Sequence, residues 1–276
     1  MGIPVSAAAP NVASVYGRSL DLRDQLFLAI SQSGRSEDLI ATAEMARSAG
    51  AITATIVNEP DSPLTRACEF ILPMEAGPEL SVAASKSFIA SLAALLRLTA
   101  EWTGDIRMRN AVAGLPEWLA AATELDWSSA LPIFSPAASM ITVGRGPTLA
   151  IAREAALKLK EVCNIHAEAF SSAEFQHGPI SLVERSYPVL MFTPTDAAAA
   201  GSEQLQLRLS RQGAAVFATG QASGSPPLLP MLEPHQSEAD AICLIQTFYR
   251  FILDLAATRG SDVDHPRHLQ KVTSTL

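Results

Sequence analysis

The sequence predicts an α/β protein with two doubly wound parallel sheets related by internal duplication, the first lacking its opening strand and helix. Three observations support this prediction. Short apolar runs alternate with longer helical segments, the runs are almost continuously apolar, and the pattern starts again after a proline-rich stretch. Continuous apolar strands are typical of parallel sheets covered on both faces, and the alternation is typical of βαβ units.

The first half alternates three predicted strands with two predicted helices. The strands are Gln25–Ser31, Ile52–Val57 and Phe70–Leu72. The helices are Glu37–Ala49, followed by Gly50, and the alanine- and leucine-rich Ser81–Trp102, followed closely by Gly104. Glycine just after the last periodic residue is a common signal for the end of a helix.

The second half follows a connector, residues 115–136, that carries three prolines. Its predicted strands are Ser139–Val143, Pro188–Phe192 and Ala214–Ala218, and its helices are Thr148–Val162, Gly201–Arg211 and Ala239–Ala257. Thr219–Pro234 is a predicted loop. We therefore expect a first domain at residues 1–114, a second at 137–260, and a C-terminal tail at 261–276 that closes over the site.

The two halves align as repeats of one layer unit. When Ile3–Gly17 is aligned with Asn164–Gly178, Gly17 aligns with Gly178, and the strand near Leu28 aligns with the strand at Val189. The second half opens with a strand and helix, Ser139–Cys163, that have no counterpart before Ile3. The chain is therefore expected to begin inside its first domain, short of about one βα unit.

Composition and charge exclude several classes of protein. Hydrophobic residues make up 48% of the chain and charged residues 17%, which is typical of a compact protein and not of a disordered one. The net charge is −8, and no basic stripe is present, so we expect no nucleic-acid partner. An acidic protein can still bind an anionic small molecule, because backbone N–H groups can hold a phosphate.

Location and cofactors are predicted from what the sequence lacks. Met1 leads into Ile3 without a basic region, and the longest apolar stretch, Ile242–Ala257, contains polar and charged residues. We expect a cytoplasmic protein with no membrane partner. Three well-separated cysteines show no metal-ligand spacing and are predicted to be reduced core residues, so we expect no metal and no cofactor.

The densest titratable cluster lies within residues 150–179. Its members are Glu154, Lys158, Lys160, Glu161, His166, Glu168, Glu174 and His177. Glu154, Lys158 and Glu161 lie at i, i+4 and i+7, on one face of the predicted helix. A carboxylate beside a lysine, with histidines nearby, can perform acid–base chemistry near neutral pH. An ordinary ion pair on a solvated face explains Glu154 and Lys158 equally well, whereas Glu161 with His177 favours chemistry.

The turn SQSGRS, residues 31–36, lies between a predicted strand and a predicted helix. Parallel sheets bind ligands at the carboxyl ends of their strands, and helix N-termini offer free N–H groups to an anion. Three hydroxyls, a glutamine and Gly34 suit a phosphate monoester. The alternative is that the serines only cap the helix.

Two other segments and one histidine have less specific patterns. Small residues in Glu79–Phe88 could admit a ligand close to the backbone, or could simply allow tight helix packing. The tail His265–Lys271 is polar; it is either mobile or closes over a bound anion through its arginine and lysine. His235, in a proline-rich loop, is predicted to be exposed and without a role.

Four of these motifs together resemble a known family. SQSGRSED, ELSVAASKSF, ALKLKEVCNIHAEAFSSAEFQHGP and PRHLQK occur in the order found in tandem sugar isomerase (SIS) domains, and the resemblance runs from Ile3 to Lys271. The group that the chain resembles includes the isomerase half of glucosamine-6-phosphate synthase, isomerising glucosamine-6-phosphate deaminases and fructosamine-phosphate deglycases. The resemblance implies two SIS subdomains.

The resemblance also implies roles for individual residues. The residues implied to hold phosphate and line the sugar are Ser31, Gln32, Ser33, Ser36, Val82 and Gln270, with Arg267 fixing the tail. The residues implied to act in catalysis are Glu161, which would move a proton between C1 and C2, His177, which would assist ring opening, and Lys271 at the reactive end of the sugar. The resembled enzymes take this histidine from a neighbouring subunit, so we expect a homodimer with His177 contributed across the interface.

The sequence departs from the family pattern at two points. The first phosphate-contacting loop of the family is missing, and Gln270 stands where the family has a small residue before the tail lysine. The predicted activity is an aldose–ketose isomerase/deaminase reaction on an amino-sugar phosphate, most specifically glucosamine-6-phosphate, giving fructose-6-phosphate and ammonia. The enzymatic alternatives are a fructosamine-phosphate deglycase and a phosphosugar isomerase. A non-catalytic sugar-phosphate sensor is the alternative of another class.

Overall fold

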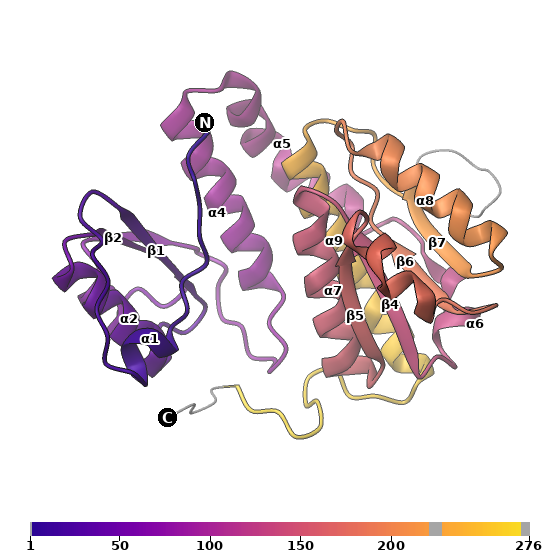
Figure 1. Ribbon diagram of the computed structural model, residues 1–276, viewed down its shortest axis with the longest axis horizontal. Coiled ribbons are helices and arrows are strands. Elements are labelled where there is room, and N and C mark those ends of the chain that lie inside the picture. The colour runs from indigo at the N-terminus through magenta and orange to yellow at the C-terminus, as the bar shows by residue number, and fades with distance from the viewer. Residues whose placement is uncertain (1, 221–227, 272–276) are drawn as a thin grey trace. The chain divides into compact units, whose positions relative to one another are not determined.

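The computed structural model describes residues 2–220 and 228–271, and its chain forms two compact units (Figure 1). The first unit comprises Met1–Leu98 and Gln270–Leu276, and the second comprises Thr99–Leu269. Both contain a purely parallel sheet with helices packed on it. The α/β class and the two sheets are therefore confirmed. The boundaries placed at residues 114 and 136 stay a prediction.

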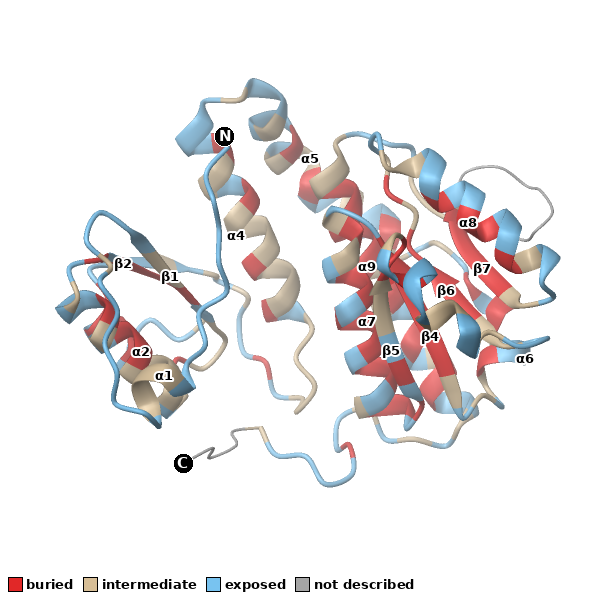
Figure 2. Ribbon diagram, viewed as in Figure 1, coloured by how far each residue is buried: buried red, intermediate tan, exposed pale blue. Residues whose placement is uncertain are grey.

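The second unit contains a five-stranded sheet of order β5-β4-β6-β7-β8. Its strands are β4 (Ser139–Gly144), β5 (His166–Ser171), β6 (Pro188–Met191), β7 (Ala215–Gly220) and β8 (Leu228–Pro230). Its helices are α5 (Ile106–Ala122), η1 (Ser128–Ala130), α6 (Leu131–Phe134), α7 (Pro147–Cys163), η2 (Glu174–His177), η3 (Pro179–Leu182), α8 (Ala199–Arg211) and α9 (Ser237–Thr258). The central strands β4, β6 and β7 are buried almost throughout (Figure 2), because helices cover both faces of a parallel sheet.

The first unit contains a three-stranded sheet of order β1-β2-β3. Its strands are β1 (Leu26–Ser31), β2 (Ile52–Val57) and β3 (Phe70–Pro73). Its helices are α1 (Asn11–Ser14), α2 (Glu37–Ser48), α3 (Pro63–Ala67) and α4 (Lys86–Thr103), the last of which continues into the second unit. The predicted helix Ser81–Trp102 was wrong at its start, because Ser81–Ser85 are not helical.

The internal repeat is visible in the order of the elements. The series β1, α2, β2, β3, α4 matches β6, α8, β7, β8, α9, and the shared strands have the same neighbours. Counterparts of β4 and α7 are absent among the described residues of the first unit. Val5–Pro10, aligned with β5, forms no strand there. In the second unit β5 pairs only with β4. Because the described part of the first unit has no counterpart of β4, the segment that corresponds to β5 has no strand to pair with.

Aromatic side chains fill the core of the second unit. Trp127 and Phe134 are almost completely buried and pack against Phe251 of α9, and Phe134 also meets Phe217 edge-on. The indole N–H of Trp127 donates to the Pro230 carbonyl at 2.8 Å, which satisfies the only polar group of that buried ring.

Arg259, just after α9, ties three chain segments together. Its guanidinium donates to the carbonyls of Cys163 (2.6 Å) and Ala137 (3.0 Å), and also to that of Ser135. Cys163 is the last residue of α7, so the arginine satisfies one of the carbonyls left unpaired at a helix end.

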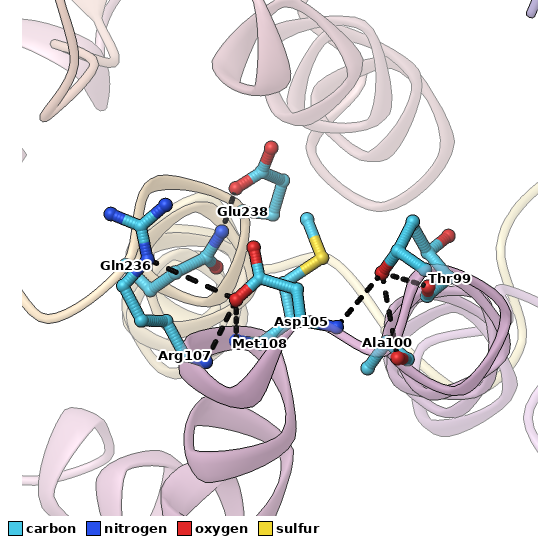
Figure 3. A network of polar contacts seen from close by, with 8 residues as sticks. Thr99, Ala100, Asp105, Arg107, Met108, Gln236 and Glu238 are labelled. Carbon is cyan, nitrogen blue, oxygen red and sulfur yellow. Dashed lines mark hydrogen bonds and ion pairs between the residues drawn. The ribbon is translucent and has the colours of Figure 1, made fainter. Parts of the chain in front are cut away.

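A side chain caps α5, the helix that follows the α4–α5 turn (Figure 3). The Asp105 carboxylate accepts hydrogen bonds from the N–H groups of Arg107 and Met108 at the start of α5. The Gln236 side chain accepts from the Ala239 N–H at the start of α9. The Asp105 cap explains why α5 begins at Ile106. The helix continues through Pro116, into the stretch that we predicted to be a connector.

Among the described residues, α9 is long and apolar enough to cross a membrane by length and composition alone. Most of it is buried against α7 and α5 inside the second unit, as in the central helix of a globular core. All three cysteines are free and buried, as predicted.

Candidate functional site

The titratable cluster on α7 is a buried network and not a solvated ion pair. Lys158 Nζ lies 2.5 Å from Glu161 Oε2 and 3.4 Å from Glu154 Oε1. Only 7% of the Lys158 side chain and 9% of the Glu154 side chain are exposed, whereas Glu161 is 21% exposed. The helical spacing predicted this shared face correctly, and the alternative of a solvated face was wrong. Glu161 is the member that solvent reaches most easily.

Glu154 also accepts a hydrogen bond from Tyr249 of α9, whose hydroxyl lies 2.7 Å from Oε1. Burial raises the pKa of the Glu154 carboxyl above its usual value, and it outweighs the lowering effects of Lys158 and Tyr249. The network therefore joins one ammonium to two carboxylates in a largely dehydrated place. Such an arrangement can hold a carboxylate ready for proton transfer.

The local sequence explains how α7 presents these residues. Pro147 occupies the first turn, where a missing N–H costs nothing, and Asn164 ends the helix in the left-handed conformation with φ of +52°. Between them, ten residues are buried against the sheet and α9, which fixes the rotation of the helix.

His177 and Arg267 also belong to the second unit and are exposed. His177 ends η2, directly before Gly178, which has φ of +142°. Within the described residues no hydrogen bond or ion pair joins His177 to Glu161. Whether His177 serves the site of a neighbouring copy stays a prediction.

The serine turn lies at the carboxyl end of β1, in the first unit. The hydroxyl oxygens of Ser31 and Ser33 accept hydrogen bonds from the N–H groups of Gly34 (3.0 Å) and Arg35 (3.3 Å), which leaves both hydroxyl hydrogens for another partner. Ser36 occupies the position before α2, but its side chain makes no capping bond. Gln32 is half-buried in the same turn. Plain capping therefore does not account for these serines.

Gly34 is required by the shape of the turn. Its φ is +61°, and a Cβ at this position would lie 2.0 Å from Ser62 Oγ. Ser62 is buried, and among the described residues its hydroxyl has no hydrogen-bond partner. The turn thus packs directly on an unpaired buried hydroxyl.

The segment after β3 contains Val82 and is joined to Lys271 by a hydrogen bond. Lys271 Nζ donates to the Ser81 carbonyl at 2.6 Å, beside the half-buried Val82. Gln270, the residue before it, is exposed. The tail lysine is therefore attached to the segment that the sequence singled out for a ligand.

Sequence reasoning missed Glu79, which organises that segment. Its carboxylate accepts hydrogen bonds from the Ser85 N–H at 2.8 Å and from the N–H and hydroxyl of Ser87 at the start of α4. Burial tends to raise the pKa of Glu79, but these hydrogen bonds and the charge of Lys271 lower it overall. A buried glutamate followed by serines at a helix start was the available signal.

The corresponding turn of the second unit is built differently. Residues 192–197 follow β6 as 31–36 follow β1, and there Asp196 accepts the Ala198 N–H at 2.8 Å just before α8. Thr195 donates to the buried Asp240 at 2.6 Å. The Asp196 carboxylate lies within this turn, where its negative charge would oppose a bound anion.

One other prediction can be compared with the structure. His235 is exposed, as predicted, and its ring stacks on Trp118 with centroids 3.9 Å apart. Within residues 2–220 and 228–271, no group of three or more histidine, cysteine, aspartate or glutamate side chains is arranged to hold a metal ion.

Two related parallel sheets, a hydroxyl-rich turn and a glutamate–lysine helix define a duplicated α/β protein. Comparison with known proteins identifies the family: residues 5–100 and 133–226 match the SIS domain. The chain belongs to the SIS-domain family.

Individual relatives agree with this assignment. The chain is 42% identical to a protein of Silicibacter pomeroyi DSS-3 provisionally named a phosphosugar isomerase, with a TM-score of 0.91 over 96% of this chain and 81% of that one. It is 26% identical to the C-terminal domain of glucosamine-fructose-6-phosphate aminotransferase from Francisella tularensis (TM-score 0.81, 96% and 79% covered).

A full-length relative extends well beyond the match. The chain is 31% identical, over 89% of its length, to the isomerizing glutamine–fructose-6-phosphate aminotransferase of Zymomonas mobilis. It spans 43% of the length of that relative.

Proposed function

We propose that the protein is an isomerising deaminase that converts glucosamine-6-phosphate and water to fructose-6-phosphate and ammonia. The observation that carries the proposal is the α7 network, in which Lys158 holds the partly exposed carboxylate of Glu161. Membership of a phosphosugar isomerase family supports the substrate class. The name of the Francisella relative points to an amino-sugar or ketose 6-phosphate.

The chemistry follows from what each group can do. The turn at Ser31–Ser36 holds the phosphate through its serine hydroxyl donors, and phosphate binding energy orients the distant carbons. His177, from a neighbouring copy in a homodimer, donates and accepts the proton that opens the ring. Val82, Gln270 and Arg267 line the sugar or fix the tail.

The central step is a proton transfer between adjacent carbons. Glu161 takes the C2 proton of the open aldehyde while O1 gains a proton from water, giving an enolamine with its hydroxyl on C1. Glu161 returns its proton to C1 while the amino group loses one to water, giving a C2 ketimine, which water hydrolyses to ketose and ammonia. Lys271 lies at the reactive end, where its ammonium stabilises the developing negative charge on O1.

The test is incubation of the full chain with amino-sugar, fructosamine and plain sugar phosphates, followed by assays for ammonia and ketose. We expect ammonia from glucosamine-6-phosphate. Glu161→Gln should lower kcat by about 100-fold or more, because a general base typically contributes that much. Glu168→Gln, at an exposed carboxylate on β5, is the matched control and should keep full activity. Unchanged turnover in Glu161→Gln would refute the assignment of the base.

A plain phosphosugar isomerase is the second candidate, favoured by the name of the Silicibacter relative. It would interconvert an aldose and a ketose phosphate without releasing ammonia, using the same carboxylate. A fructosamine-phosphate deglycase would instead be identified by product formed from the fructosamine phosphates in the panel. Binding of a sugar phosphate without any product would instead identify a sensor.

A further inference from the structure

The α7 network extends to a residue on another helix. Tyr249 lies on α9, 95 residues along the chain from Glu154, and its hydroxyl donates to the same Oε1 atom that faces Lys158. Helices α7 and α9 pack against each other, so the contact lies inside the second unit. The order of contacts is Tyr249, Glu154, Lys158, Glu161.

One ammonium serves two carboxylates in this arrangement. Lys158 Nζ is closer to Glu161 than to Glu154, at 2.5 Å against 3.4 Å. Glu154 is buried, and a buried carboxylate that lacks hydrogen-bond donors becomes protonated. The Tyr249 hydroxyl supplies the donor that helps to keep Glu154 ionised and in contact with Lys158.

Loss of that donor would change the other end of the network. A protonated Glu154 would attract the ammonium less, and Lys158 would pair with Glu161 alone. A carboxylate held by an undivided positive charge is a weaker base. The tyrosine therefore affects Glu161 without touching it.

We propose that Tyr249 is a positioning residue that holds Glu154 against Lys158 and so divides the Lys158 ammonium between Glu154 and Glu161. The inference rests on the proposed role of Glu161 as the proton-transferring group. As a consequence, Lys158 orients the Glu161 carboxylate without fully neutralising its charge.

The first test is Tyr249→Phe, which keeps the ring and removes only the hydroxyl. We expect kcat to fall about tenfold or more, because a hydrogen bond to a charged group contributes on that order, with KM unchanged. Thr247→Val is the matched control: it removes a buried hydroxyl of α9 that donates to the Ala122 carbonyl and not to the network. Thr247→Val should leave kcat unchanged.

A double-mutant cycle with Glu154→Gln tests the route of the effect. If Tyr249 acts through Glu154, removing the hydroxyl in the Glu154→Gln background should cost much less than in the wild type. Fully additive losses in kcat, or an unchanged kcat in Tyr249→Phe, would overturn the inference.

A readout without turnover separates this inference from the proposed function. Lys158 is buried, whereas its neighbour Lys160 is exposed and bonds to the Ala167 carbonyl. Acylation with an amine-selective reagent, followed by peptide mass spectrometry, gives the labelling ratio of the two lysines. Tyr249→Phe should raise the Lys158 share of the labelling several-fold, because the Lys158 ammonium then pairs with one carboxylate instead of two. If the wild type turns over none of the sugar phosphates, the proposed function fails, and this ratio alone decides: a rise supports the positioning role and an unchanged ratio overturns it.

Discussion

Replacing Gly34 by alanine tests whether the serine turn is held in one required shape. Two costs can be estimated from the structure. The φ of +61° strains any residue with a Cβ by about 1–2 kcal/mol. The new Cβ would also lie 2.0 Å from Oγ and 2.6 Å from Cβ of Ser62, and such overpacking costs about 1–3 kcal/mol. The total is roughly 2–5 kcal/mol.

Gly77→Ala is the matched control in the same unit. Gly77 has a similar φ of +69°, but nothing lies within 4 Å of the position of its Cβ. It should therefore show the strain of about 1–2 kcal/mol without the clash. Urea denaturation followed by circular dichroism measures both variants, and calorimetry with inorganic phosphate measures anion binding. We expect weaker phosphate binding only in Gly34→Ala.

The comparison of the two variants decides the outcome. If Gly34→Ala is no more destabilising than Gly77→Ala, the turn yields easily and its packing on Ser62 is unimportant. If phosphate binds equally well to both variants and to the wild type, the turn is not the phosphate site.

Three further predictions concern the second unit. Arg259→Ala should destabilise the protein by about 2–4 kcal/mol, because three carbonyls lose a charged donor; Arg250→Ala, which breaks an exposed pair, should change the urea midpoint little. Because burial raises the pKa of Glu154, the folded state binds its proton more tightly, so the free energy of unfolding should fall as the pH rises from the unfolded value of 4.5 through the raised one. Glu154→Gln should lack this component in urea titrations across pH; an identical slope would contradict the shift. Burial raises the pKa of Cys163 and of Cys243 to about 12, so iodoacetamide at pH 8 should modify neither thiol until the protein unfolds, and rapid native labelling would refute their burial.

The sequence predicted most of the fold because the central strands are continuously apolar. Ile52–Val57 was predicted at both ends, and the other central strands within two residues. The strand His166–Ser171 was missed because it lies at the edge of the sheet, where alternate residues such as His166 and Glu168 face solvent. Its pattern resembled a polar loop.

The candidate site could be predicted only where its residues share one element. Glu154, Lys158 and Glu161 were found because helical spacing alone aligns them. Tyr249 could not be found in this way, since its contact depends on how α9 packs on α7. The sequence also did not show that Glu154 and Lys158 are buried, because alanine-rich helices can bury more than one face.

The two repeats suggest how one layer unit acquired two tasks. Both place a turn between a strand and a helix at the carboxyl edge of the sheet, where an anion could bind. The second turn carries Asp196, whose carboxylate accepts the Ala198 N–H just before α8 and would repel a phosphate. The first turn has serine hydroxyls instead. Under the proposed function, the first repeat would bind the phosphate, and the second, which carries the carboxylates of α7, would transfer the proton. Replacing Asp196 by serine should then be neutral for catalysis, and a large loss of kcat in that variant would contradict this division.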